Sequence, residues 1–387
     1  MTPKRFGIIA EWNPFHKGHA AMIRNIKESM PEAALLAVIS GSFVQRGEPS
    51  LFDKWSRARW AVQSGIDAVF ELPLLFALQS ADRFSEWGSR LLFSLGCNGI
   101  YFGTESLERE ELLDAAAFSM TPRYTKALRE ALHEGLSYAQ SAFSAMSIHS
   151  SRLAEELSKP NNLLGYRYTE TILRNGYEME IYVYHRDVAH NISASAARGD
   201  LLSCNTSPLI PPHVKEEAES LMESGNYTDF SRYEDACLLV SRLLTETDLA
   251  YSGLFKEGLE HKWYKESQNE SYSLMLDQIK SKRYLYSRLK RTGAALLLSG
   301  RGKSPFSSAP CCSYARLLAL RKEKSGLLAS INIPLITSYA KALRTLPSPM
   351  AESLMLDGKG TDVRACFMKS ASFRKSREDF YHSPEIL

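Results

Sequence analysis

Short apolar runs alternate with amphipathic stretches over the first hundred residues of the chain. Four runs have the length and the flanking turn residues of buried strands, at residues 6–10, 33–39, 67–73 and 99–102. Apolar residues at helical spacing follow the first three runs, from near Gly18, over residues 53–64 and over residues 80–95. Strands that alternate with helices predict a parallel sheet covered on both faces, which is a doubly wound α/β fold.

Each predicted strand ends in a polar loop that carries a glycine or a proline. These loops lie at residues 13–18 and 40–47, at Pro73, and at residues 103–105. In open α/β sheets, ligands bind outside the carboxyl ends of the strands. A binding site is therefore expected where these loops meet.

The chain beyond residue 105 adds further helices before it changes character. Helices are expected within residues 114–157 and 166–175, a returning strand at 179–184, and another helix that opens near Ile192. Prolines at positions 208, 211 and 212 indicate a linker. We therefore expect an α/β domain at residues 1–205, a mainly helical domain at 213–346 with a short strand within 331–336, and a weakly ordered tail at 347–387, which is rich in Lys, Arg, Ser and Gly.

Composition narrows the class of protein only slightly. The 387 residues are 44% hydrophobic and 24% charged, and the net charge is +3, which neither requires nor excludes a nucleic-acid partner. None of the six cysteines forms a Cys-x-x-Cys pair, which argues against zinc-ribbon and thioredoxin sites. No segment approaches the ~20 apolar residues of a membrane helix. We expect a cytoplasmic protein with reduced cysteines and no membrane partner.

The strongest chemical signal is Asn-Pro-Phe-His-Lys-Gly-His at residues 13–19, between the first strand and the first helix. A helix N-terminus offers N–H groups and positive potential to phosphates, and Gly18 lets the backbone come close. His16 and His19 are expected to donate hydrogen bonds to an α-phosphate under attack. Gly7, in the strand, is expected to leave room for adenine or ribose. The alternative is a turn with two incidental histidines, and a zinc site lacks a third ligand nearby.

A second phosphate-binding signal is Ser193-Ala-Ser195 at the start of a later helix. Serines at a helix start act as N-caps and offer hydroxyl donors, and Arg198 in the first turn is positioned to reach a β- or γ-phosphate. The alternative is an ordinary N-cap beside a surface arginine. Arg46 is a candidate to hold a carboxylate or a tRNA phosphate, while Lys54 faces either ligand or solvent.

The densest basic cluster lies in the predicted helical domain. It contains Lys282, Arg283, Tyr284, Arg288 and Arg291. Arginines that bind phosphates and a tyrosine that stacks on a base are typical of RNA-binding surfaces. The alternative is a solvated amphipathic helix, but further basic residues follow, and we favour RNA binding.

Several segments together carry a family resemblance. They are residues 7–16, 40–49, 71–73, 102–105, 158–166, 192–195 and 282–284. His16-Lys-Gly-His19 is similar to the His-x-Gly-His signature of the adenylyltransferase superfamily. The stretches at 40–49 and 159–166 resemble, more narrowly, the bacterial tRNA(Met) cytidine acetate ligases. Trp12 stands where that family has Tyr, and Ala197 stands where it has a larger aliphatic residue.

This resemblance implies a Rossmann-like domain of the adenylyltransferase type at residues 1–205. It also implies ATP contacts from Gly7, Ile8, Ile9, Ala10, Glu11, Trp12, Asn13, Pro14, Phe15, His16, Lys17, Gly18, His19, Ala20, Gly103, Asn161 or Asn162, and Arg186. Acetate would attack the α-phosphate of ATP to give acetyl-adenylate and pyrophosphate, with Mg²⁺ present. The N4 amine of the wobble cytidine of elongator tRNA(Met) would then take the acetyl group and release AMP.

Two other functions share the same phosphate site. A small-cofactor adenylyltransferase needs no RNA surface, and the extra helical half of the chain argues against it. A non-catalytic RNA-binding protein that senses ATP would bind the nucleotide without releasing pyrophosphate.

Overall fold

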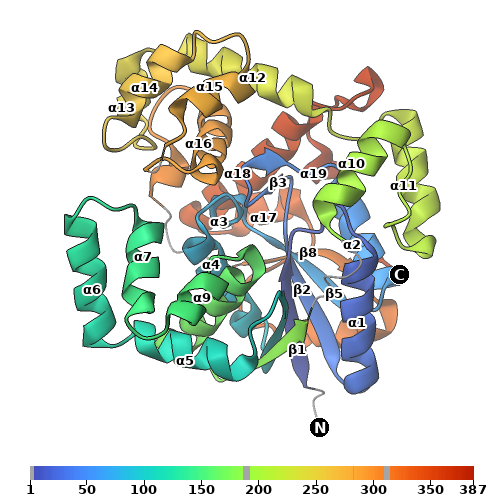
Figure 1. Ribbon diagram of the computed structural model, residues 1–387. Coiled ribbons are helices and arrows are strands. Elements are labelled where there is room, and N and C mark those ends of the chain that lie inside the picture. The colour runs from blue at the N-terminus through green and yellow to red at the C-terminus, as the bar shows by residue number, and fades with distance from the viewer. Residues whose placement is uncertain (1–3, 186–191, 282, 309–313) are drawn as a thin grey trace.

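The computed structural model describes residues 4–185, 192–281, 283–308 and 314–387 (Figure 1). One sheet has the strand order β10 (Glu385–Ile386), β8 (Ala315–Leu320), β5 (Ala68–Leu72), β2 (Ala34–Ser40), β1 (Arg5–Ala10), β6 (Gly99–Thr104) and β7 (Glu180–His185), and β9 (Leu335–Ile336) pairs with β8. The central pairs are parallel, and β8 runs antiparallel to β5. The predicted parallel α/β sheet is confirmed.

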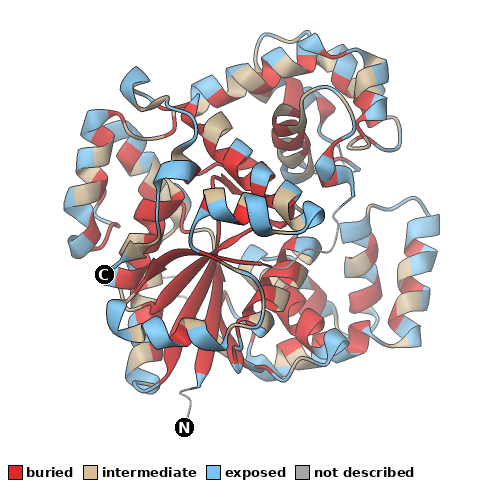
Figure 2. Cartoon of the chain, turned by 180° about the vertical axis from the view of Figure 1, so that it is seen from behind, coloured by how far each residue is buried: buried red, intermediate tan, exposed pale blue. Residues whose placement is uncertain are grey.

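Helices cover both faces of this sheet, because successive strand residues point to opposite sides. Phe6 and Ile8 of β1 pack in the core shared with α1 (Lys17–Ser29) and α2 (Lys54–Gln63). Ile9 packs in the other core, with α4 (Ala81–Ser94). Figure 2 shows the central strands buried along their length, which leaves the polar loops at their ends as the expected place for a ligand.

The segment after β6 is helical. It contains α5 (Arg109–Ser119), α6 (Pro122–His133), α7 (Tyr138–Ser147), α8 (Ser151–Glu156) and α9 (Pro160–Asn175). Helix α9 packs on α4 and α5, while the antiparallel pair α6 and α7 stands out at the side of the molecule (Figure 1). Pro160 occupies the first turn of α9, where its missing N–H costs nothing, so the helix expected at residues 166–175 starts earlier, at Pro160.

A second group of helices follows β7. It contains α10 (Ala194–Cys204), α11 (Pro212–Ser224), α12 (Phe230–Leu243), α13 (Glu246–Tyr251), α14 (Leu259–Glu266), α15 (Tyr272–Ile279) and α16 (Tyr286–Ser299). Helices α12 to α16 gather into one lobe above the carboxyl edge of the sheet (Figure 1). The division at residue 205 stays a proposal, but β8 and β9, from the part predicted to be mainly helical, belong to the same sheet as β1.

The prediction of a weakly ordered tail is wrong. Residues 347–387 form α18 (Ser348–Ala365), α19 (Glu378–Tyr381) and β10, and α17 (Tyr339–Thr345) precedes them. The tail is rich in Lys, Arg, Ser and Gly, but it also carries Leu354, Asp357 and Asp379, which are all at most 1% exposed. These side chains find apolar and charged partners inside the fold, and such burial offsets the entropy of ordering the chain.

Candidate active site at the start of the first helix

The loop after β1 ends in two stacked histidines. His16 is the N-cap of α1, and its Nδ1 accepts a hydrogen bond from the Gly18 N–H at 3.1 Å. His19 Nδ1 accepts in turn from the His16 N–H at 3.2 Å. The two ring centroids lie 3.6 Å apart, with 23° between the planes. The histidines therefore form a capping box that uses imidazoles in place of the usual Ser and Glu.

This capping box determines which ring nitrogen can donate. A neutral imidazole has one acceptor and one donor nitrogen. Because both Nδ1 atoms accept from the backbone, the proton of each neutral ring lies on Nε2. Both rings thus present an N–H at the positive end of α1, which is the arrangement that stabilises a phosphate as it gains charge. The structure brings His16 and His19 together as predicted.

The structure shows what surrounds the two glycines near this loop, and the close approach of a phosphate to Gly18 stays a prediction. A Cβ on Gly18 would lie 3.0–3.1 Å from the His16 ring, so Gly18 makes space for the capping imidazole. A Cβ on Gly7 would lie 2.5 Å from Leu92 Cδ2, inside the core beneath α4. The expectation that Gly7 leaves room for adenine or ribose is therefore wrong, because the side chain of Leu92 fills the space beside Gly7.

Asn13 links the phosphate loop to two neighbouring segments. Its Oδ1 accepts from the Leu51 N–H at 2.7 Å, and its backbone carbonyl accepts from Arg198 Nη1 at 3.0 Å. Arg198 also pairs with Glu48 at 3.1 Å. Arg198 thus lies beside the loop, and its predicted contact with a β- or γ-phosphate stays a prediction.

Helix α10 starts beside the first turn of α1. A Cβ on Gly18 would come within 3.5 Å of Ile192 Cγ2. Ser193 caps α10 by accepting from the Ala196 N–H, and Ser195 is exposed in the first turn. Two helix N-termini therefore meet near Gly18, which fits a ligand with several phosphate groups.

The predicted contacts after β6 form a tight hydrogen-bonded junction. The Glu105 carboxylate accepts from the Asn161 and Asn162 N–H groups at the start of α9, at 3.1 and 2.8 Å. Asn162 is fully buried, and its Oδ1 accepts from the Glu105 N–H at 2.9 Å. Gly103 lies in β6, one residue before Thr104. Asn162 therefore holds the end of β6 against α9, while Arg186 lies outside the described residues.

Glu11 occupies the other side of the phosphate loop. Its Oε1 accepts from the Gln45 N–H at 2.5 Å, which ties the end of β1 to the loop after β2. Arg57, fully buried, donates to the backbone carbonyls of Glu11 and Ser40 at 2.6 and 3.0 Å. Burial raises the pKa of Glu11, against the opposing effect of Arg46. The group is therefore a stronger proton acceptor than an exposed glutamate.

The hairpin of β3 (Phe43–Val44) and β4 (Glu48–Pro49) joins this edge of the sheet to the helical lobe. At Gly47, where φ is +80°, an added Cβ would lie 2.4 Å from the backbone nitrogen of Arg291 in α16. The Tyr233 hydroxyl donates to the Gly47 carbonyl at 2.8 Å, and Lys290 pairs with Glu48 at 3.5 Å. Helix α16 therefore packs directly against the loop that hydrogen-bonds Glu11.

The predicted RNA-binding residues form two groups: Arg288 and Arg291 on α16, and Arg283 and Tyr284 in the segment before it. Arg288 and Arg291 lie on α16, and burial together with the neighbouring Arg288 lowers the pKa of Arg291 to about 10. Arg283 is exposed and pairs with Glu257 at 3.1 Å. Tyr284 is only 8% exposed, and its hydroxyl donates to the Glu257 carbonyl, which argues against its predicted stacking on a base. Lys282 lies outside the described residues.

Sequence reasoning missed a buried ionic cluster near the ends of β5 and β8. Lys54, which is fully buried, pairs with Glu71 at 2.9 Å and with Asp379 at 2.7 Å. Arg316 pairs with both carboxylates. Lys54, for which the sequence left ligand and solvent open, therefore faces neither of them. No local signal could have found this cluster, since its members come from distant parts of the chain.

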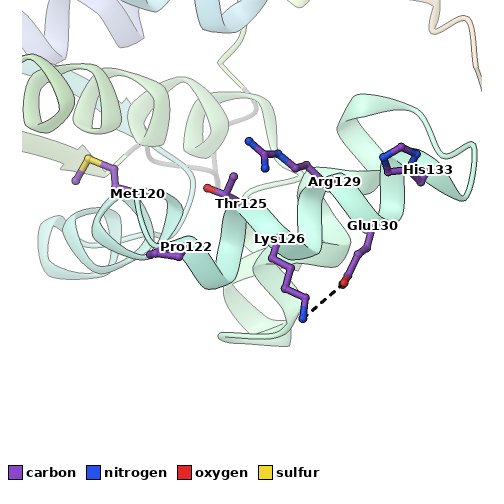
Figure 3. Close-up of a pocket in the computed structure, with 7 residues that line it drawn as sticks. All are labelled: Met120, Pro122, Thr125, Lys126, Arg129, Glu130 and His133. Carbon is purple, nitrogen blue, oxygen red and sulfur yellow. Dashed lines mark ion pairs between the residues drawn. The ribbon is translucent and has the colours of Figure 1, made fainter.

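A shallow cavity of about 400 Å³ lies on α6, away from the phosphate loop (Figure 3). Its lining residues are Met120, Pro122, Thr125, Lys126, Arg129, Glu130 and His133. None of them belongs to the predicted site.

In the part of the chain that the structure describes, no helix combines the length and the apolar composition of a membrane-spanning segment.

Comparisons with known proteins agree with this geometry. Residues 4–379 match the family model described as HIGH Nucleotidyl Transferase. A tRNA(Met) cytidine acetate ligase of Bacillus velezensis is 32% identical over 381 residues, covering 92% of this chain and 91% of that protein. The Bacillus subtilis protein of the same name is 31% identical, covering 87% and 88%.

Among solved structures, Thermotoga maritima TmcAL bound with alpha-thio ATP superposes with a TM-score of 0.91 at 27% identity, covering 99% of both chains. Its apo form has a TM-score of 0.89. The likeness thus extends over both the α/β part and the helical lobe. The chain belongs to the HIGH nucleotidyl transferases and, within them, to the tRNA(Met) cytidine acetate ligase family.

Proposed function

We propose that this protein is an ATP-dependent tRNA ligase that joins acetate to the N4 amine of the wobble cytidine of elongator tRNA(Met). The observation that carries the proposal is the pair of Nε2–H donors at the start of α1. The basic helix α16 packs on the neighbouring β3–β4 hairpin. A phosphate site and a basic helix near the same edge of the sheet fit a two-step reaction on RNA. The names of the relatives supply the tRNA and the acetyl group.

In the first step, an acetate oxygen attacks the α-phosphorus of ATP. The new O–P bond forms as the bond to the β-phosphate oxygen breaks, and pyrophosphate leaves. Charge accumulates on the α-phosphate oxygens, where the imidazoles of His16 and His19 donate hydrogen bonds. Each such donor is worth about 10²–10³ in rate. The starts of α1 and α10, with Ser193, Ser195 and Arg198, supply donors for the β- and γ-phosphates.

In the second step, the cytidine amine attacks the acetyl carbonyl and releases AMP. The wobble base lies in an anticodon loop, so it is presented unpaired at modest cost. Arg288 and Arg291 on α16 are proposed to bind phosphates of that loop. With the loop bound there, the wobble base would reach the Gln45–Glu11 side of the phosphate loop. A reaction on tRNA also fits a cytoplasmic protein.

Mg²⁺ is proposed to arrive with the triphosphate. Among the described residues, no group of three or more His, Cys, Asp or Glu side chains could hold a metal on its own. Mg²⁺ usually keeps several waters and binds substrate phosphates with one or two carboxylates, so the donor set fits a nucleotide-borne ion rather than a protein cage. The ion would neutralise charge on the departing pyrophosphate. We assign it no protein ligand.

One experiment tests the proposed function. The protein is incubated with ATP, Mg²⁺ and labelled acetate, with and without bulk tRNA, and pyrophosphate, AMP and labelled RNA are measured. Label on tRNA only in the presence of ATP is the expected result. AMP joined to a small acceptor would indicate a cofactor adenylyltransferase, and ATP binding without pyrophosphate release would indicate a nucleotide sensor. Either of these outcomes would overturn the proposal.

A further inference from the structure

Four of the glutamates at the carboxyl edge of the sheet are Glu11, Glu48, Glu71 and Glu105, and the last three are bound to protein partners. Glu48 pairs with Arg198 and Lys290, Glu71 pairs with Lys54 and Arg316, and Glu105 accepts the N–H groups of Asn161 and Asn162. Glu11 is the fourth. Within the described residues it has no ion pair, and its one hydrogen bond is from the Gln45 N–H to Oε1. Its second oxygen is thus available to a ligand.

The surroundings of Glu11 favour proton acceptance. The residue is half-buried, and the charged or titratable groups that act on it are Arg46, Glu48, Arg57 and Tyr168. Burial and Glu48 raise its pKa, while Arg46, Arg57 and the Gln45 N–H oppose the rise, and the net shift is upward. A carboxylate whose pKa moves toward neutrality is a better general base at physiological pH.

The histidines are unsuited to the same task. Both Nδ1 atoms already accept backbone N–H groups, so in the neutral rings Nε2 carries a proton. A ring in this state donates to phosphate and has no lone pair left for a substrate proton. The base for the second step must therefore come from another side chain on this edge.

We propose that Glu11 accepts the proton that the cytidine N4 amine loses when it attacks the acetyl-adenylate, an inference that rests on the proposed function. The N4–carbonyl carbon bond forms and the bond from that carbon to the phosphate oxygen breaks. The proton passes from N4 to Glu11 Oε2. AMP leaves as an anion and needs no proton, so atoms and charges balance.

The position of Glu11 between two elements supports this role. It lies five residues before His16, at the point where the phosphate loop begins, and it is hydrogen-bonded to the hairpin on which α16 packs. The adenylate is held on one side, and the RNA arrives from the other. A proton acceptor for the transfer step is needed at this junction.

The test is Glu11→Gln, which keeps an oxygen for the Gln45 N–H but removes the base. Acetate-dependent ATP–pyrophosphate exchange reports the first step, and single-turnover transfer of labelled acetyl to tRNA reports the second. We expect the rate of acetyl transfer to fall about 10²-fold, which is within the range for loss of a general base. The rate of ATP–pyrophosphate exchange should fall far less. In the parent, the transfer rate should rise with pH as Glu11 ionises, and this rise should be absent in the variant.

Two further variants keep the test decisive. Glu11→Asp retains the carboxylate and should recover part of the transfer rate and its pH dependence, whereas Glu28→Gln, on the exposed face of α1, should match the parent. Equal losses in exchange and transfer, or an unchanged pH profile in Glu11→Gln, would overturn the inference. If the parent itself places no acetyl on tRNA, the proposed function fails instead.

Discussion

Asp379→Asn should destabilise the protein through the buried ionic cluster. Asp379 is 1% exposed and lies between two cations, with Lys54 Nζ 2.7 Å from Oδ1 and Arg316 in contact with the same oxygen. Burial by itself raises the pKa of Asp379, but Lys54 and Arg316 lower it overall. The carboxylate is therefore ionised in the fold, and the amide would leave Glu71 to face both cations.

The magnitude follows from this geometry. Removing one partner of a buried ion pair costs about 3–5 kcal/mol. Unfolding entropy of about 2.1 cal/mol/K per residue gives about 0.8 kcal/mol/K for 387 residues, so the melting temperature should fall by about 4–6 °C. The loss should shrink in acid, because a carboxyl with a lowered pKa stabilises the fold above its unfolded pKa and ceases to do so as pH falls through its folded pKa.

Differential scanning calorimetry at neutral pH measures this shift. Glu378→Gln removes the same charge one residue away, at a partly exposed carboxylate 3.2 Å from His382, and should change stability by under about 0.5 kcal/mol. A melting temperature of Asp379→Asn equal to that of the control would refute the account of the cluster, and with it the physical reason given for the ordered tail.

The remaining predictions concern the site and the core. His19→Ala should lower acetate-dependent ATP–pyrophosphate exchange about 10²–10³-fold, and exchange at the parent rate would exclude its imidazole as a phosphate donor. Gly7→Ala should lower the free energy of unfolding by about 1–3 kcal/mol in denaturant titrations, because the new Cβ overlaps Leu92; an unchanged midpoint would contradict that packing. Arg291→Gln should weaken tRNA binding and reduce the slope of log K against log salt by about 0.7–0.9, whereas an unchanged slope would remove Arg291 from the RNA surface. Burial and Glu71 raise the pKa of Asp357 to about 7, so stability should fall as pH rises from about 4 toward 7, and Asp357→Asn should flatten that part of the stability curve.

The parallel strands of the central sheet could be predicted from the sequence because each is a local apolar run closed by a turn, whereas their order in the sheet could not. No tertiary contact had to be known to predict the strands at residues 6–10, 33–39 and 99–102. Strand β8 was missed because Ala315–Leu320 is buried on both faces, and such a run has no strict alternation to distinguish it from a buried helix. Its antiparallel pairing with β5 is a property of the assembled sheet.

The phosphate loop was predictable in kind but not in detail. The spacing of His16 and His19 at a strand-to-helix turn indicated a phosphate site. That both Nδ1 atoms cap the helix, which leaves Nε2–H as the donor, depends on side-chain rotamers that a motif does not specify. The ordered tail was unpredictable for a similar reason, because Asp379 finds Lys54 across more than three hundred residues.

The most direct test of the central claim is a crystal structure of this protein with an ATP analogue. The account predicts that the triphosphate lies against the first turn of α1, with the Nε2 atoms of His16 and His19 within hydrogen-bonding distance of phosphate oxygens. A nucleotide bound elsewhere, or imidazoles turned away from its phosphates, would contradict it.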